Sequence, residues 1–196
     1  MQTRISLQSL GMLITKVKVG KVTNLSEARY CAGMGVDLLS FPISSIDPKT
    51  YQEITNWVAG PMFGIEVMKA DLEKLIQYNS EFIYASTELI DHLPGDRKLV
   101  VSSADWASEK TQLINAKDRI LFLELAIPSI NATTESIIDE ASREFQVIAK
   151  VSHSKDLESI LKLPIAGISL EGSSETKVGL KEYPLAEILE QLEGGD

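Results

Sequence analysis

Short apolar runs alternate with amphipathic stretches along the whole chain. Their lengths and periods predict eight strands, at residues 16–20, 36–41, 62–67, 82–86, 98–103, 119–126, 145–150 and 165–170. Each strand precedes a stretch with helical periodicity, at residues 24–35, 46–58, 69–78, 87–93, 104–116, 132–145, 152–163 and 184–194. Strands that alternate with helices indicate a parallel sheet, and eight such units can close into a (β/α)₈ barrel. A doubly wound open sheet is the competing architecture, but it usually has fewer strands.

Capping residues mark where two of these helices begin. Asn24 stands at an N-cap position with Glu27 three residues later, which is the pattern of a capping box. Gly35 fits the position just after the same helix. Asp47 is predicted to cap the next helix, with Pro48 in its first turn.

The chain has no Pro-, Gly- or Ser-rich linker and no break in composition, so we predict one domain over residues 1–196. That length is at the lower bound for a barrel, which requires short loops. Residues 1–14 lack the apolar core and cleavage site of a signal peptide, and we expect them to form a short extension packed against the domain.

Composition and charge limit the classes of partner. The chain is 44% hydrophobic and 24% charged, as in ordinary globular proteins, and no apolar run approaches the length that spans a bilayer. Its net charge of −9 disfavours nucleic acid and anionic membranes as partners. The single cysteine, Cys31, forms no intramolecular disulfide and is consistent with a reducing cytoplasm.

Both ends of the chain resemble one enzyme family. Residues 18–41 read KVGKVTNLSEARYCAGMGVDLLSF, which looks like the first βαβ unit of phosphoribosylanthranilate isomerases, K-I-C-G-I-T-N followed by a helix and G-A-D-x-x-G-F. The positions in register are Lys18, Val22, Thr23, Asn24, Ala28, Gly35, Asp37 and Phe41. IDPKTYQEI (46–54) looks like the family's I-S-P-E-x-A-x-x-I, and residues 167–192 look like its closing segment, with Glu175, Gly179 and Lys181 on matching positions.

The resemblance implies a barrel of the ribulose-phosphate-binding type, related to an isomerase of tryptophan biosynthesis. The family's reaction is an Amadori rearrangement, which needs a general base, a general acid and a phosphate site. In the family a Cys after strand 1 is the base and an Asp after strand 6 is the acid. The Cys position here is Gly20, and the acid position is best matched by Glu124. Glycine cannot act as a base, so the resemblance outlines the parental site without its base.

The family's phosphate-binding glycines are also altered. Its S-G-G after strand 7 corresponds to Ala149, Lys150 and Val151, and its Arg-bearing loop after strand 2 is shortened to residues 42–45. Gly172, Ser173 and Ser174 after strand 8 can form a small anion-binding nest, or simply a Ser-rich turn. Lys21 can reach a phosphate, or lie in solvent as a loop lysine.

Five charges interrupt the apolar strands, namely Lys18, Glu66, Glu124, Lys150 and Glu171. Charged residues in a barrel strand face the lumen or lie near a strand end, and unpaired burial is costly, so we expect a paired network at the barrel mouth. This network is either a structural ion-pair cluster, which we slightly favour, or a redesigned acid/base site around Lys18, Glu124 and Lys150. A desolvated lysine there could also form a Schiff base with a carbonyl.

The remaining candidate residues favour structural roles. We expect Cys31 to be a buried thiol and Trp57 and Trp106 to be packing residues on helices. His92 and His153 are placed near helix ends. No His, Cys or Asp spacing is typical of metal ligands, so we predict neither metal nor cofactor.

Two functions follow from these observations. The first is an isomerase-like enzyme with altered activity toward a small phosphorylated anion, acting in the cytoplasm as a monomer or homodimer. The second is a catalytically inactive barrel that senses a small anion or binds a protein. Convergent charges beside an open pocket favour the first, and exposed apolar side chains on the outer helices favour the second.

Overall fold

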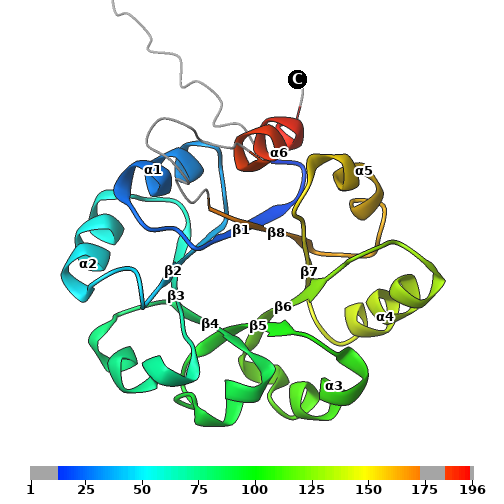
Figure 1. Cartoon of the computed structure of the whole chain (residues 1–196), viewed down its shortest axis with the longest axis horizontal. Helices are drawn as coiled ribbons and strands as arrows, with labels where there is room; N and C mark the ends of the chain where they lie inside the picture. The colour runs from blue at the N-terminus through cyan, green and yellow to red at the C-terminus, as the bar shows by residue number, and fades with distance from the viewer. Residues whose placement is uncertain (1–12, 173–183, 195–196) are drawn as a thin grey trace, which may run out of the picture.

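A computed structural model of the chain describes residues 13–172 and 184–194. Eight parallel strands form a closed barrel in the order β1 to β8, and β1 pairs with β8 to close it (Figure 1). The strands are β1 (Lys16–Gly20), β2 (Leu38–Pro42), β3 (Met62–Glu66), β4 (Phe82–Ser86), β5 (Lys98–Ser103), β6 (Ile120–Ala126), β7 (Val147–Lys150) and β8 (Gly167–Glu171). The predicted (β/α)₈ barrel is therefore confirmed.

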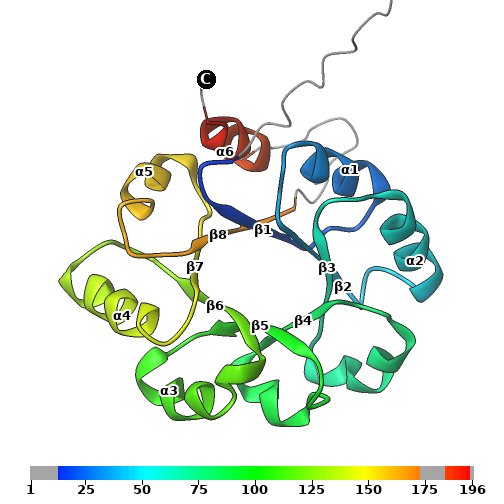
Figure 2. The same cartoon turned by 180° about the vertical axis from the view of Figure 1, so that it is seen from behind.

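Helices surround the strands as an outer ring. They are α1 (Leu25–Gly33), α2 (Pro48–Trp57), α3 (Trp106–Asn115), α4 (Ala132–Ser142), α5 (Leu157–Ile160) and α6 (Pro184–Leu192), with 3₁₀ helices η1 (Lys69–Gln77), η2 (Thr87–His92), η3 (Lys117–Arg119) and η4 (Ser154–Asp156). Two views place α6 outside β1 and β8 (Figure 2). The Ile14 amide donates to the Leu192 carbonyl at 3.0 Å, which ties the start of the described chain to α6.

Three connections differ from the predicted α-helices. Residues 69–77 and 87–92 form 3₁₀ helices, and residues 154–160 combine a 3₁₀ turn with one short α-helical turn. A 3₁₀ helix rises about 2.0 Å per residue against about 1.5 Å for an α-helix. It therefore spans the height of the barrel with fewer residues, which suits a chain near the lower size limit for this fold.

The predicted caps are present. The Asn24 side chain accepts a hydrogen bond from the Glu27 amide at 2.9 Å, and the Glu27 carboxylate accepts one from the Thr23 amide at 3.3 Å. Asp47 accepts bonds from the amides of the first turn of α2, where Pro48 stands. Gly35 has a φ of 81°, the left-handed conformation that glycine adopts without steric cost after a helix.

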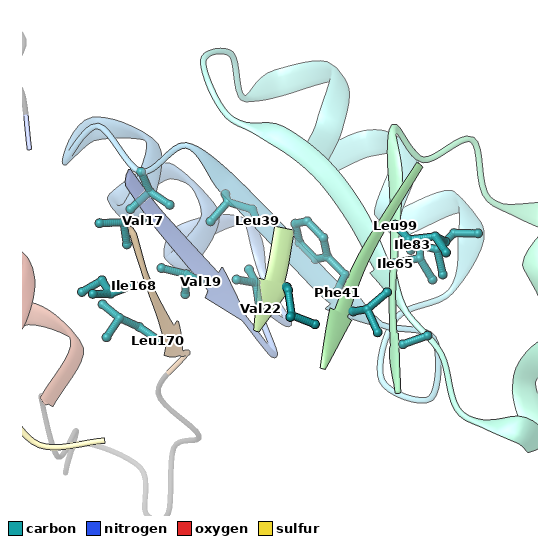
Figure 3. Packing of buried hydrophobic residues seen from close by; sticks show 14 of the residues in the cluster. Val17, Val19, Val22, Leu39, Phe41, Ile65, Ile83, Leu99, Ile168 and Leu170 are labelled. Atoms are coloured by element: carbon teal, nitrogen blue, oxygen red, sulfur yellow. The ribbon is translucent and has the colours of Figure 1, made fainter. Parts of the chain in front are cut away.

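One set of alternate strand residues faces outward and packs against the helices. Val19, Phe41 and Ile65 are fully buried in this cluster, several of whose members are drawn in Figure 3. Cys31 of α1 joins it with no exposed surface. The expected buried thiol is therefore confirmed, and burial and the nearby charge of Glu27 raise its pKa to about 12.

The two tryptophans differ from each other. Trp106 is 4% exposed, packs edge-to-face on Phe145 with ring centroids 6.0 Å apart, and donates to the Glu140 carboxylate at 2.8 Å. Trp57 was expected to pack as well, but it is 80% exposed. It is the last residue of α2.

The other alternate set of strand residues faces the lumen, and its lower part is apolar. The side chains that fill this part are Leu38, Phe82, Val100, Phe122 and Ile148. Gly64 leaves room for the Phe82 ring, because a β-carbon on Gly64 would overlap three of the ring carbons. Small and large residues on neighbouring strands thus complement each other, and the lumen is a packed core below the mouth.

We expect Gly64→Ala to destabilise the barrel by about 1–3 kcal/mol, because the added methyl forces the Phe82 ring out of a filled lumen. Urea unfolding measures the change. Gly33→Ala is the matched control, since a β-carbon there meets no heavy atom within 4 Å and alanine is the better helix former. Equal stability of the two variants would contradict the packed-lumen interpretation.

Candidate functional site

The carboxyl ends of the strands bring five charged residues of the sequence analysis to one mouth of the barrel. Lys18, Glu66, Glu124, Lys150 and Glu171 all line a single small cavity there. In (β/α)₈ barrels this is the face that carries active sites. The expected network at the barrel mouth is therefore present in the structure.

The centre of the network is a buried ion pair. Lys18 is 3% exposed and Glu124 is 2% exposed, and the Lys18 Nζ lies 3.2 Å from the Glu124 Oε2. The same ammonium donates to the Ser169 Oγ at 3.3 Å and lies 3.9 Å from the centroid of the Tyr84 ring. The β1 lysine is thus surrounded by side chains of β4, β6 and β8.

Hydrogen bonds hold Glu124 as a carboxylate. The Tyr84 hydroxyl donates to its Oε1 at 2.6 Å, and the Ser169 hydroxyl donates to its Oε2. Burial alone raises the pKa of a carboxyl, but the Lys18 charge and these two donors outweigh it, so the pKa of Glu124 lies below its ordinary value. Burial and the Glu124 charge in turn raise the pKa of Tyr84, which keeps its proton.

Gly20 lies beside a second carboxylate. A β-carbon on Gly20 would stand 2.6 Å from the Glu66 Oε1 and 3.1 Å from the Lys18 Nζ. Glu66 Oε1 accepts hydrogen bonds from the Ser40 hydroxyl at 2.6 Å and from the Lys21 amide at 2.7 Å. Lys21 has a φ of 56°, a strained conformation for a residue with a side chain, and it aims this amide at Glu66.

A third carboxylate joins the two outer lysines. Glu171 accepts from the Lys21 Nζ at 2.7 Å and from the Lys150 Nζ at 2.6 Å. The hydrogen bond to Glu171 raises the pKa of Lys150 above its ordinary value. Burial raises the pKa of Glu171, but its two lysine partners outweigh burial and lower it. Both ammonium groups proposed for anion binding or catalysis thus share one carboxylate partner.

The anion nest expected after β8 is only partly described. Ser173 and Ser174 lie outside the described residues, whereas Gly172 is within them. The Gly172 amide donates to the Gly20 carbonyl at 2.7 Å. A β-carbon on Gly172 would lie 2.6 Å from the Glu27 Oε1, so a carboxylate stands directly beside it. Neither feature favours an anion at Gly172 itself.

Two cavities of very different size lie at this face. The one at the barrel axis has a volume of about 20 Å³, which is room for about one water molecule. Beside it is an open cleft of about 1110 Å³, lined by the carboxyl ends of β2 to β5, by the segments that follow β1 to β4, and by Glu171 and Gly172. Glu66, Lys21, Tyr84 and Glu171 line both cavities, so they form the border between them.

Three members of the network were not singled out in the sequence. Ser40, Tyr84 and Ser169 each contact a charged side chain at the mouth. Strand alternation could have indicated them. Each lies an even number of residues from another lumen-facing residue of its own strand, so it faces the lumen as well. A hydroxyl in a strand is too common for its residue type alone to indicate a site.

The described part of the chain contains no group of three or more His, Cys, Asp or Glu side chains that could hold a metal ion. His92 and His153 are both exposed, at the end of η2 and at the start of η4 respectively. None of the helices in residues 13–172 and 184–194 has the length and apolar character of a membrane span. The site therefore consists of carboxylates, lysines and hydroxyls.

No family model matches the chain, and no curated protein matches its sequence. Solved structures match its fold. Phosphoribosylanthranilate isomerase from Thermotoga maritima aligns with a TM-score of 0.71 and 14% identity over 93% of this chain and 100% of that one. The enzyme from Thermus thermophilus aligns with a TM-score of 0.68 and 15% identity, over 90% of this chain and 98% of that one. KGPDC from Streptococcus mutans aligns with a TM-score of 0.60 and 10% identity, over 93% of this chain and 100% of that one. At these identities the likeness shows the fold, which is that of the family suggested by the sequence.

We expect Glu124→Gln to destabilise the protein by about 3–5 kcal/mol, because it leaves the buried Lys18 ammonium without a counter-charge. Replacing both residues, Lys18→Met with Glu124→Leu, removes the buried charges together and should recover most of the loss. Urea unfolding measures both variants. Glu158→Gln is the control, since it breaks an exposed pair with Lys162 and should leave the unfolding midpoint unchanged. A Glu124→Gln variant as stable as this control would contradict the buried-pair interpretation.

The same pair predicts a loss of stability in acid. Because the pKa of Glu124 is lower in the folded state than its ordinary 4.5, its contribution is complete above pH 4.5 and is lost as pH falls through the folded value. Melting temperatures between pH 7 and pH 3 test this expectation. The Lys18→Met, Glu124→Leu double variant should lose less melting temperature over that range than the wild type, whereas an identical loss would contradict it.

Proposed function

We propose that this chain is a barrel of phosphoribosylanthranilate isomerase ancestry that no longer catalyses the parental Amadori rearrangement and instead binds a small molecule in the cleft beside its mouth. One observation supports this proposal above the others. The axial cavity, where the parental base and acid would face a substrate, has a volume of about 20 Å³ and is bordered by charged side chains that bind one another. A sugar phosphate does not fit in that volume.

The parental base is missing and its space is occupied. Gly20 stands at the family's cysteine position, and the Glu66 carboxylate lies where a side chain on residue 20 would begin. Restoring a cysteine there would displace Glu66 from Ser40 and from the Lys21 amide. The loss of the base is thus coupled to a new set of contacts.

The best match for the parental acid is held in its ionised form. A general acid must carry a proton at the working pH, but Glu124 has a lowered pKa and accepts every hydrogen bond that it makes. It is also 2% exposed and lies beneath the other mouth residues. We infer that Glu124 and Lys18 are structural partners here, and that the parental activity in tryptophan biosynthesis has been lost.

A rebuilt acid/base enzyme is the second candidate. The position of Glu66 favours it, because this carboxylate replaces the cysteine in space and also lines the open cleft. In this candidate Glu66 takes the place of the base, and Lys150, which is 37% exposed, is the nearby proton donor of the network. Glu171 binds Lys150 at 2.6 Å and raises its pKa, which makes Lys150 a weak acid, so the inactive barrel remains the better-supported proposal.

A direct assay separates the two candidates. Phosphoribosylanthranilate is generated in situ and the loss of its fluorescence is followed with wild type, Glu66→Gln, Lys150→Met and Glu158→Gln. We expect wild type to show no turnover above a heat-killed sample, because base and acid are both absent, while the Thermotoga maritima enzyme gives full turnover as positive control.

Turnover by wild type would overturn the proposal of lost parental activity. If Glu66→Gln or Lys150→Met then removed that turnover while Glu158→Gln retained it, the rebuilt site would be established. Turnover that survived both substitutions would place the chemistry elsewhere in the barrel and would exclude both candidates as stated.

A further inference from the structure

The residues that line the cleft indicate the chemical class of its ligand. This inference rests on the proposed small-molecule binding. It has a volume of about 1110 Å³, slightly above the range of typical ligand pockets, and it lies at the functional face of the barrel. Pro42, Val67, Ala85 and Leu89 contribute apolar lining. Four serines also line it, namely Ser44 and Ser45 in the loop after β2, Ser86 at the end of β4 and Ser102 in β5. Such a lining suits a small molecule with an apolar body and several hydroxyl groups.

The charges of the cleft disfavour an anion. Four carboxylates line it against two lysines: Glu66, Asp71, Glu88 and Glu171 against Lys21 and Lys69. Lys21 is neutralised by Glu171, which also binds Lys150. A phosphate in the cleft would therefore have to approach the carboxylates of Glu66 and Glu88, which pair with no cation in the described part of the chain, while the Lys21 ammonium already pairs with Glu171.

Pairing leaves two carboxylates available to a ligand. Asp71 forms a salt bridge with Lys74 at 3.3 Å. Glu66 and Glu88, by contrast, have no cation within 4.0 Å among residues 13–172 and 184–194, and their described partners are hydroxyls and one backbone amide. Lys69 and Glu88 are both exposed, so water screens both of these charges, whereas Glu66 is half-buried.

Glu66 is the better placed of these two carboxylates. Its Oε1 is fixed by the Ser40 hydroxyl and the Lys21 amide, so the carboxylate is held in one orientation. Its Oε2 accepts no hydrogen bond from the described residues. A half-buried carboxylate with one oxygen anchored and the other available is preorganised to receive a charged N–H donor.

We propose that the cleft binds a small hydroxylated amine, whose ammonium group pairs with Glu66 while serine hydroxyls receive its hydroxyl groups. The ligand carries no phosphate. In this assignment the ligand is recognised at the border of the cleft instead of at the barrel axis. Glu66 therefore has a binding role in the inactive barrel.

Matched probes on two scaffolds test this assignment with the full chain. The first set is glucosamine, glucose and glucose 6-phosphate, and the second is benzylamine, benzyl alcohol and benzyl phosphate. Each is titrated to tens of millimolar into ¹⁵N-labelled protein, and shifts of the Ser44, Ser86 and Ser102 amide resonances report binding in the cleft. The variants are Glu66→Gln and, as a control with the same charge change at a remote exposed site, Glu158→Gln.

We expect the amine of at least one set to bind about tenfold more tightly than its phosphate counterpart, because only the amine gains a charge-assisted bond to Glu66. Glu66→Gln should remove this preference and Glu158→Gln should keep it. If, in both sets, a phosphate or neutral probe bound in the cleft as tightly as its amine, the ligand class would be overturned while small-molecule binding would stay in place. If no probe shifted the cleft resonances, the ligand class and the proposed binding role would both fail, whereas the loss of isomerase activity is judged separately by the fluorescence assay.

Discussion

The Lys18 ammonium lies inside a closed barrel, and the arrangement of the mouth follows from the need to neutralise it. A buried cation without a partner costs several kcal/mol. Glu124 supplies the counter-charge from β6, Ser169 accepts from β8, and Tyr84 presents its ring from β4 while its hydroxyl binds Glu124. Four strands are thereby joined across the lumen by one polar cluster. The same cluster fills the barrel axis, so the interaction that satisfies Lys18 also closes the place where a barrel enzyme usually holds its substrate.

The architecture could be predicted from the sequence because its signals are local. Alternation within each strand, the Asn24 and Asp47 caps and the left-handed Gly35 each depend on a few neighbouring residues. The need for pairing among the strand charges was equally predictable from the cost of burial. The partners were not, because Lys18 and Glu124 are 106 positions apart and only closure of the barrel brings them together. Trp57 was misjudged for a related reason, since residue type indicated burial and its place at a helix end decided exposure.

Gly20 illustrates what a single sequence conceals about a lost residue. In the sequence, glycine stands where the family that the chain resembles has its cysteine. In the structure the vacated space holds the Glu66 carboxylate, which comes from β3, and the backbone of Lys21 adopts a strained conformation to bind it. The change is therefore an exchange between strands. Glu66 lines both the axial cavity and the cleft, so the proposed loss of the parental chemistry and the proposed binding site are compatible in one scaffold.

The burial of Cys31 has a practical consequence for studying this protein in solution. The chain has one cysteine, its thiol has no exposed surface, and its pKa is raised to about 12, so almost none of it is thiolate at neutral pH. A thiol-directed reagent can then modify Cys31 only after α1 separates from the barrel. The modification rate therefore reports how often that separation occurs. A second cysteine introduced on the surface would react alone in the folded state, which allows site-specific spectroscopic labelling without removing the natural residue.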